Sequence, residues 1–190
     1  MCGIFGVLSD EPVVNKIIKG LHKLEYRGYD SSGVSVVVDQ KIQTIRAQGK
    51  LINLKKKLSN KKIEGTLGIG HTRWATHGIP STKNAHPHNS TNVSIVHNGI
   101  IENYSELKKD LLKKGYVFKS ETDSEVIAHL IDLNLKNSAP EQALKKTLSC
   151  LEGAFAIAIL FKDQNFLVGA RKGSPLAIGV SEKSFYLGSD

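Results

Sequence analysis

The order of strand-like and helix-like segments constrains the fold more than any other feature of this sequence. Strand patterns occupy both ends of the chain, and three helical stretches follow one another between them without a linker or a change in composition. This order favours two stacked sheets that are covered by helices. Because a chain of 190 residues suits one domain, residues 1–190 are expected to form a single unit, whose sheet order the periodicity leaves open.

Hydrophobic periodicity and turn residues locate the individual elements. Pro140 suits the first turn of a helix, and Thr122 or Asp123 can cap the helix before it. The expected helices are residues 11–24, 51–58, 104–114, 123–135 and 140–151. The expected strands are residues 3–8, 34–38, 41–46, 66–74, 92–96, 154–161, 166–170, 175–180 and 184–187.

Composition disfavours several classes of function. The net charge is +8, but only four of the 26 basic residues are arginine, and the lysine runs are not interleaved with aromatic residues. A solvated surface therefore explains the charge better than nucleic-acid binding does. No apolar run is long enough to span a bilayer and no signal peptide is present, so a cytoplasmic protein without membrane association is expected. Cys2 and Cys150 are expected to be reduced, with Cys150 packed in the core.

Cys2 directly follows the initiator methionine. Removal of Met1 would leave a thiol and a free α-amine on one residue, so that a nucleophile and its base come together. Their ordinary pKa values, about 8.5 and about 7.7–8.0, allow a proton to be shared near neutral pH. The alternative interpretation is a small apolar residue that opens a buried strand.

Two expected strand ends carry clustered polar residues. Residues 71–78 (HTRWATHG) begin in a strand and end in a turn, and residues 95–99 (IVHNG) repeat this arrangement. Polar side chains at the end of a buried strand need partners, which favours ligand contacts over a plain junction with a packed Trp74. Asn98-Gly99 is typical of a hairpin turn, yet an Asn amide and a glycine N–H also supply two donors to a developing oxyanion.

Three further groups of polar residues each permit two interpretations. Residues 121–124 (ETDS) suit a helix N-cap, or a carboxylate that receives the ammonium group of a ligand. Residues 26–33 (YRGYDSSG) carry more oriented polar groups than a plain connection needs, although these charges can pair with one another. Five histidines lie within residues 71–97, but their spacing fits no familiar ligand pattern, so neither a metal nor a cofactor is expected.

Together these motifs resemble the class II glutamine amidotransferases. The resemblance is carried by residues 1–4 (MCGI), 24–31 (LEYRGYDS), 71–78 (HTRWATHG), 84–88 (NAHPH), 96–103 (VHNGIIEN) and 120–125 (SETDSE). It covers essentially the whole chain and is greatest to the glutaminase domains of the glucosamine-6-phosphate synthases. The resemblance implies the α+β fold of the N-terminal nucleophile hydrolases, a four-layer αββα sandwich in which helices flank two mostly antiparallel sheets.

The resemblance also implies an activity and roles for the matched residues. L-Glutamine would be hydrolysed to glutamate and ammonia through a γ-glutamyl thioester on Cys2, with the α-amine of Cys2 as the proton shuttle. Asn98 and the Gly99 N–H match the positions that bind the oxyanion. Arg73 and Asp123 match the positions that bind the α-carboxylate and the α-ammonium of glutamine. The other matched residues are Trp74, Thr76 and His77, in a loop that closes over glutamine, and Arg27, His86 and His97 at supporting positions.

The synthases that this chain resembles carry two sugar isomerase modules after the glutaminase domain, and those modules bind fructose 6-phosphate. The chain is therefore expected to be an excised domain or one subunit of a split enzyme, monomeric alone and part of a homodimer in the full-length enzyme, where its ammonia would serve glucosamine 6-phosphate synthesis. Two alternatives stay open. One is a different acceptor, such as phosphoribosyl diphosphate, aspartate or 2-oxoglutarate, and the other is a glutamine-sensing module without catalysis.

Overall fold

The computed structural model describes residues 2–190, and Met1, whose removal the proposed chemistry of Cys2 requires, lies outside the described residues. Every strand and helix predicted from the sequence corresponds to an element of the structure, with ends that differ by at most three residues. Two short elements are not predicted, because two or three residues carry no periodic pattern. They are the 3-10 helix η1 (Glu25–Arg27) and the strand β5 (His88–Asn89).

Residues 3–99 form strands with helices between them, residues 104–149 form three consecutive α-helices, and residues 155–188 form strands alone. The longer strands are β1 (Gly3–Ser9), β2 (Ser31–Val38), β3 (Lys41–Gln48), β4 (Leu67–Arg73), β6 (Val93–Gly99), β7 (Phe155–Phe161), β8 (Leu167–Lys172), β9 (Ala177–Ser181) and β10 (Ser184–Gly188). The α-helices are α1 (Val14–Leu24), α2 (Leu51–Leu58), α3 (Tyr104–Lys113), α4 (Glu125–Leu135) and α5 (Pro140–Ser149).

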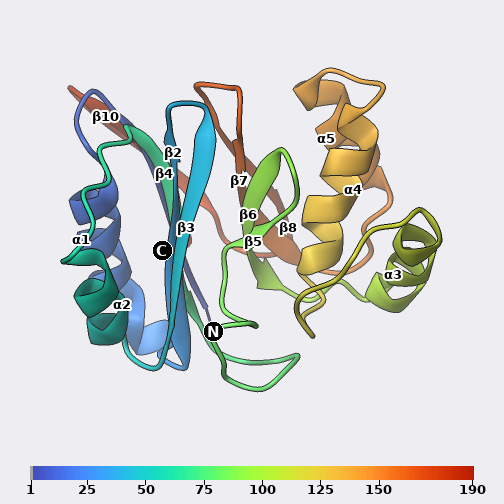
Figure 1. Ribbon diagram of the computed structural model, residues 1–190, viewed down its shortest axis with the longest axis horizontal. Coiled ribbons are helices and arrows are strands. Elements are labelled where there is room, and N and C mark those ends of the chain that lie inside the picture. The colour runs from blue at the N-terminus through green and yellow to red at the C-terminus, as the bar shows by residue number, and fades with distance from the viewer. Residues whose placement is uncertain (1) are drawn as a thin grey trace.

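Two antiparallel sheets form the centre of the molecule. The six-stranded sheet has the order β3-β2-β4-β1-β10-β9, and the four-stranded sheet has the order β5-β6-β7-β8. Figure 1 shows α1 and α2 on the outer side of the six-stranded sheet, and α3, α4 and α5 on the outer side of the other. This arrangement confirms the four-layer αββα sandwich.

Alternation along β4 decides which side chains face the second sheet, because successive residues of a strand point to opposite faces. Ile69 is fully buried in the core between the sheets, whereas a Cβ atom built at Gly70 would meet a side-chain carbon of Ile17 at 2.4 Å. Helix α1 therefore packs directly on the backbone of β4. The same alternation turns His71 and Arg73 toward the second sheet at the end of the strand.

Alternation along β6 separates the next two functional candidates. Val96 belongs to the core between the sheets, and Ile95 belongs to the core under the helices. Asn98 therefore faces the six-stranded sheet, and His97 faces the beginning of α4. Since β6 continues through Asn98 and Gly99, the interpretation of this pair as a two-residue hairpin turn is wrong.

The predicted side-chain cap of α4 is also wrong. The N-cap residue is Ser124, and it makes no side-chain capping hydrogen bond. The Asp123 carboxylate instead accepts a hydrogen bond from the Ile101 N–H at 2.8 Å, and the Thr122 hydroxyl lies 3.0 Å from Nε2 of His88. Both side chains are used in tertiary contacts that a local capping pattern does not reveal.

The expectation that Cys150 packs in the core is wrong as well. Cys150 follows the last turn of α5 and is exposed, with its Sγ donating to the carbonyl of Lys146 at 3.2 Å. The predicted position of Pro140 at the start of the same helix is confirmed. Cys2 and Cys150 are both free thiols, as the sequence predicts.

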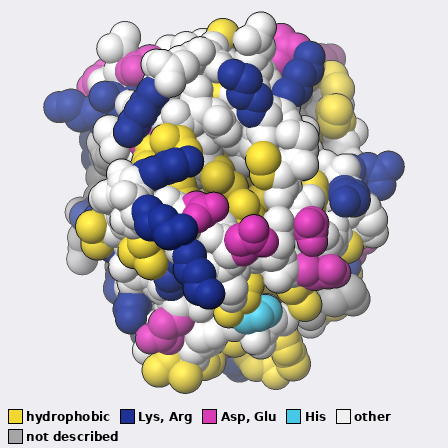
Figure 2. Space-filling model, turned by 90° about the vertical axis from the view of Figure 1, so that its right-hand side faces the viewer, with side chains coloured by type: hydrophobic (Ala, Val, Ile, Leu, Met, Phe, Trp, Pro, Cys, Tyr) yellow, Lys and Arg dark blue, Asp and Glu magenta, His cyan; other side chains and the backbone are white. Residues whose placement is uncertain are grey.

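The surface over α3, α4 and α5 carries mixed charges. Figure 2 shows lysine and arginine side chains dispersed on this face, with acidic and apolar side chains between them. Some of these charges form exposed ion pairs, such as Lys145 with Glu141 at 2.8 Å. Within residues 2–190, no helix combines the length and the apolar character that crossing a membrane requires.

Candidate active site

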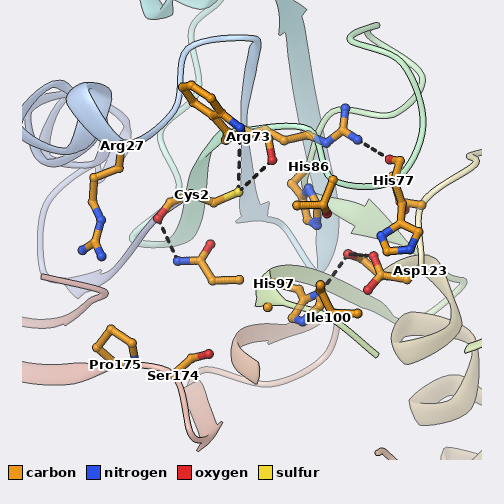
Figure 3. Close-up of a pocket in the computed structure, with 16 residues that line it drawn as sticks. Cys2, Arg27, Arg73, His77, His86, His97, Ile100, Asp123, Ser174 and Pro175 are labelled. Atoms are coloured by element: carbon orange, nitrogen blue, oxygen red, sulfur yellow. Dashed lines mark hydrogen bonds between the residues drawn. The ribbon is translucent and has the colours of Figure 1, made fainter. Parts of the chain in front are cut away.

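A cavity of about 290 Å³ lies where the beginning of β1 meets the ends of β4 and β6. All the site residues proposed from the sequence line it: Cys2, Arg27, Arg73, Trp74, Thr76, His77, His86, His97, Asn98, Gly99 and Asp123. The lining also includes Ile100, Thr122, Ser124, Ser174 and Pro175. The last two precede β9 and carry no sequence pattern that indicates a site (Figure 3).

Cys2 stands directly before β1 and presents its thiol to the cavity. The Trp74 N–H donates to the Cys2 Sγ at 3.2 Å, and the Sγ lies 3.5 Å from the Trp74 carbonyl oxygen. Burial raises the pKa of the thiol above its ordinary value, although the backbone of Trp74 and the Arg73 guanidinium lower it in part. The resting group is therefore a thiol, which needs a base before it can act as a nucleophile.

Arg73 is buried, with 3% of its surface exposed, and holds the loop that follows β4. Its Nη2 donates to the carbonyls of His77 and of Gly78, the latter at 3.1 Å, and its Nη1 donates to Ile79 at 3.5 Å. The Asp30 carboxylate lies 3.8 Å from Nη1. A guanidinium carries five N–H donors, so these three carbonyl contacts leave capacity for a ligand carboxylate.

The charged side chains of residues 26–33 pair with other segments rather than with one another. Arg27 donates to the carbonyl of Ser189 at 2.9 Å and lies 3.4 Å from the Asp190 carboxylate. Asp30 accepts a hydrogen bond from the Ala75 N–H in addition to its ion pair with Arg73. This loop therefore holds the segments that follow β10 and β4, the two strands between which β1 lies. The interpretation of its charges as an internal pair is wrong.

Asp123 is 3% exposed and faces the cavity from the segment before α4. Besides the Ile101 N–H, it accepts a hydrogen bond from the Ser124 hydroxyl at 3.3 Å, and that hydroxyl lies 2.8 Å from Nδ1 of His97. Because the single hydroxyl proton goes to the carboxylate, Nδ1 of His97 is the donor to Ser124. Figure 3 shows Cys2 and Asp123 on opposite sides of the cavity.

Four buried histidines lie in or next to the cavity wall: His86 and His97 line the cavity, and His71 and His88 do not. The rings of His71 and His86 stack with centroids 4.2 Å apart, and His86 contacts His88 edge to face at 4.5 Å. Burial lowers the pKa of His71 and His88 to about 3 and that of His97 to about 4, and it holds the pKa of His86 well below its usual range. All four rings are therefore uncharged at neutral pH.

Trp74 and His77 border the mouth of the cavity. The Trp74 side chain is 49% exposed and contacts Tyr29 edge to face at 5.6 Å, so the alternative of a plain junction with a packed Trp74 is wrong. The His77 ring contacts Tyr104 at 5.4 Å. Among residues 2–190, no group of three or more His, Cys, Asp or Glu side chains is arranged to hold a metal ion.

Comparison with known sequences identifies relatives over the full chain. Residues 71–190 match the family described as the glutamine amidotransferase domain. The chain is 52% identical to a glutamine–fructose-6-phosphate aminotransferase (isomerizing) of Mesorhizobium japonicum and 54% identical to one of Bradyrhizobium diazoefficiens. Each alignment covers 100% of this chain and 32% of the relative, so the chain spans about a third of the length of these proteins.

Solved structures match the same fold. A glutamine phosphoribosylpyrophosphate amidotransferase from B. subtilis, complexed with ADP and GMP, matches with a TM-score of 0.84 at 30% identity, over 99% of this chain and 42% of that one. A glutamine aminotransferase class-II domain protein from Silicibacter pomeroyi matches with a TM-score of 0.71 at 15% identity, over 98% of this chain and 88% of that one. The second likeness is evidence for the fold alone.

Proposed function

The chain belongs to the class II glutamine amidotransferases, and from this premise we propose that it hydrolyses L-glutamine to glutamate and ammonia through a γ-glutamyl thioester on Cys2. The observation that carries the proposal is the common cavity in which Cys2, Asn98, Arg73 and Asp123 meet. Its volume of about 290 Å³ lies at the lower end of the range for ligand sites, which suits one small metabolite.

Two charges of opposite sign would recognise the amino acid end of glutamine. The Arg73 guanidinium would bind the α-carboxylate, and the Asp123 carboxylate would bind the α-ammonium. Because Asp123 lies across the cavity from Cys2, glutamine held at Asp123 extends its carboxamide toward the thiol (Figure 3). A glutamine within a peptide lacks both charges, so the site would select free glutamine.

The Cys2 sulfur would attack the carboxamide carbon, and its proton would pass to the α-amine of the same residue once Met1 is removed. That amine would then protonate the carboxamide nitrogen, which leaves as ammonia, and water would hydrolyse the thioester to glutamate and the free thiol. The Asn98 amide, whose Nδ2 lies 3.0 Å from the Cys2 carbonyl, is close enough to the nucleophile to donate to the oxyanion together with the Gly99 N–H.

The acceptor of ammonia is proposed from the relatives. Those with about half of their residues identical to this chain are named as glutamine–fructose-6-phosphate aminotransferases, whereas the phosphoribosylpyrophosphate amidotransferase is 30% identical. We therefore favour fructose 6-phosphate as the acceptor in a full-length protein, with residues 1–190 as the glutaminase domain. The sugar site and any dimer contacts would belong to the two thirds of the relatives that this chain does not match.

The decisive experiment treats the chain with an electrophilic glutamine analogue and measures its intact mass. Because Cys150 is exposed, Cys150→Ala is the background for all samples. We expect a chain without Met1 that carries one label and, without the analogue, releases glutamate and ammonia from glutamine. Cys2→Ala should fold, take no label and release no product. A folded chain that lacks Met1 and takes no label would contradict the proposal. Glutamine binding without glutamate formation would indicate a sensing module.

A further inference from the structure

His71 is a buried residue of β4 to which neither the sequence nor the proposed chemistry assigns a role. It pairs in register with Ile4 of β1 and with Gly33 of β2, and none of its surface is exposed. Its ring points across to the end of β6. There its Nε2 lies 3.0 Å from the side-chain oxygen of Asn98 and 3.1 Å from the carbonyl oxygen of His97.

The two contacts of His71 determine its protonation. The carbonyl oxygen of His97 can only accept, so the Nε2 of His71 must carry the proton. Burial lowers the pKa of His71 to about 3, so the ring is neutral and its Nδ1 bears no proton. That Nδ1 has no hydrogen-bond partner. The ring therefore makes its polar contacts through the Nε2–H alone.

The donor on His71 also determines which way the Asn98 amide points. Because the Nε2–H would repel the N–H donors of the amide, Oδ1 of Asn98 turns toward His71, and the amide nitrogen turns toward Cys2, where it donates to the Cys2 carbonyl at 3.0 Å. A rotation of the amide by 180° would place two N–H donors against each other at His71. It would also present an oxygen lone pair toward Cys2.

We propose that His71 is a positioning residue that holds the Asn98 amide with its N–H donors directed at the reaction centre. The inference rests on the proposed glutaminase function, in which those donors stabilise the oxyanion of the tetrahedral intermediate. With the amide reversed, its oxygen would face the developing negative charge and oppose it. The stack on His86 at 4.2 Å holds the ring, and the Nε2–H supplies the orientation.

The test compares two substitutions that differ in where they place a donor. In His71→Gln the amide nitrogen can reach the position of Nε2, whereas in His71→Asn the shorter side chain ends near Nδ1, where the structure offers no partner. We expect His71→Asn to lower kcat at least tenfold with a KM for glutamine within threefold of wild type, and His71→Gln to restore kcat to within about threefold. Equal kcat losses in the two variants would overturn the inference.

A double-mutant cycle separates positioning from a general structural effect. Removal of an oxyanion donor lowers kcat by about 10²–10³, and we expect Asn98→Ala to fall in this range. If His71 acts only through Asn98, adding His71→Asn to Asn98→Ala should not lower kcat further. A further tenfold loss in the double variant would refute the role.

His129→Leu is the matched control, because His129 is a buried histidine of α4 that does not line the cavity. We expect a wild-type kcat from it even where its melting temperature falls with that of His71→Asn. A failure of the proposed function can be distinguished from a failure of the inference about His71. A wild-type chain without Met1 that neither reacts with the glutamine analogue nor releases glutamate rejects that function, whereas an active wild type with an unchanged His71→Asn variant rejects only the inference about His71.

Discussion

Lowering the pH from 7.5 to 5.0 is expected to destabilise this fold strongly, because its buried histidines must stay neutral. Burial lowers the pKa of His71 and His88 to about 3 and that of His97 to about 4. Arg73 and Arg46 also lower the pKa of His88, whereas Glu125 raises it and Asp123 raises that of His97. In the unfolded chain the same histidines bind protons below about pH 6.5.

The sign and the size of this effect follow from proton linkage. Below pH 6.5 the unfolded state binds protons that the folded state does not, so stability present above pH 6.5 is lost as the pH falls toward the folded pKa values. Each pH unit costs about 1.4 kcal/mol per histidine. At pH 5.0 this is about 2 kcal/mol for each of these three histidines, or about 6 kcal/mol together, which is comparable to the whole stability of a small domain. His86, whose pKa burial also holds well below its usual range, adds to this loss.

The assay is urea unfolding, followed by circular dichroism at several pH values between 7.5 and 5.0 at constant ionic strength. Glu125 does not interfere. Burial raises its pKa, but the His129 ring, whose Nε2 lies 3.5 Å from the carboxylate, and hydrogen bonds from Lys119 and Ser120 lower it to about 2, so its contribution is lost only below about pH 4.5. Below pH 6.5, His71→Gln should reduce the slope of the unfolding free energy against pH by about 1.4 kcal/mol per pH unit. A free energy of unfolding that changes by less than about 1 kcal/mol over this range would refute the reasoning.

Four substitutions test other contacts. Gly99→Ala should destabilise the fold by at least about 3 kcal/mol in urea unfolding, since φ is +125° and the new Cβ would meet the Ala154 carbonyl oxygen at 2.1 Å; a smaller loss would show that β6 can shift. Asp123→Asn should raise the KM for glutamine about 10- to 100-fold in initial-rate assays, and an unchanged KM would remove Asp123 from substrate binding. Ser124→Ala should raise that KM by about fivefold, because Asp123 loses one of its two donors; an unchanged KM would show that the Ile101 N–H holds Asp123 alone. Cys150→Ala should leave the free energy of urea unfolding within about 0.5 kcal/mol of wild type, because its side chain is exposed.

Local pattern determined the elements and the candidates for the site. Periodicity located every strand and helix longer than three residues, because a buried face repeats at the spacing of the element that carries it. The sequence also marked Cys2, the polar end of β4 and the polar end of β6 as unusual, since buried polar groups require partners. The sequence does not explain the glycines on the outer face of β4, such as Gly70. The structure does, because α1 packs on them and leaves no room for a side chain.

The errors arose where a local pattern had a tertiary competitor. Thr122 and Asp123 fit a helix cap, but each found a stronger use across the molecule, with His88 and with the Ile101 N–H. Cys150 is apolar enough for the core, yet it follows the last turn of α5 and is exposed, and the next residue, Leu151, is buried in its place.

Only the tertiary structure decided which strand ends meet. Alternation predicts that His71 and Arg73 share a face of β4 and that Asn98 and His97 point to opposite faces of β6, but it does not specify the partner of either face. The stacking of the two sheets brings the end of β4 against the end of β6, and so places the donor of His71 on the amide of Asn98. Pairing between sheets depends on contacts between residues far apart in the chain, and no local spacing encodes it.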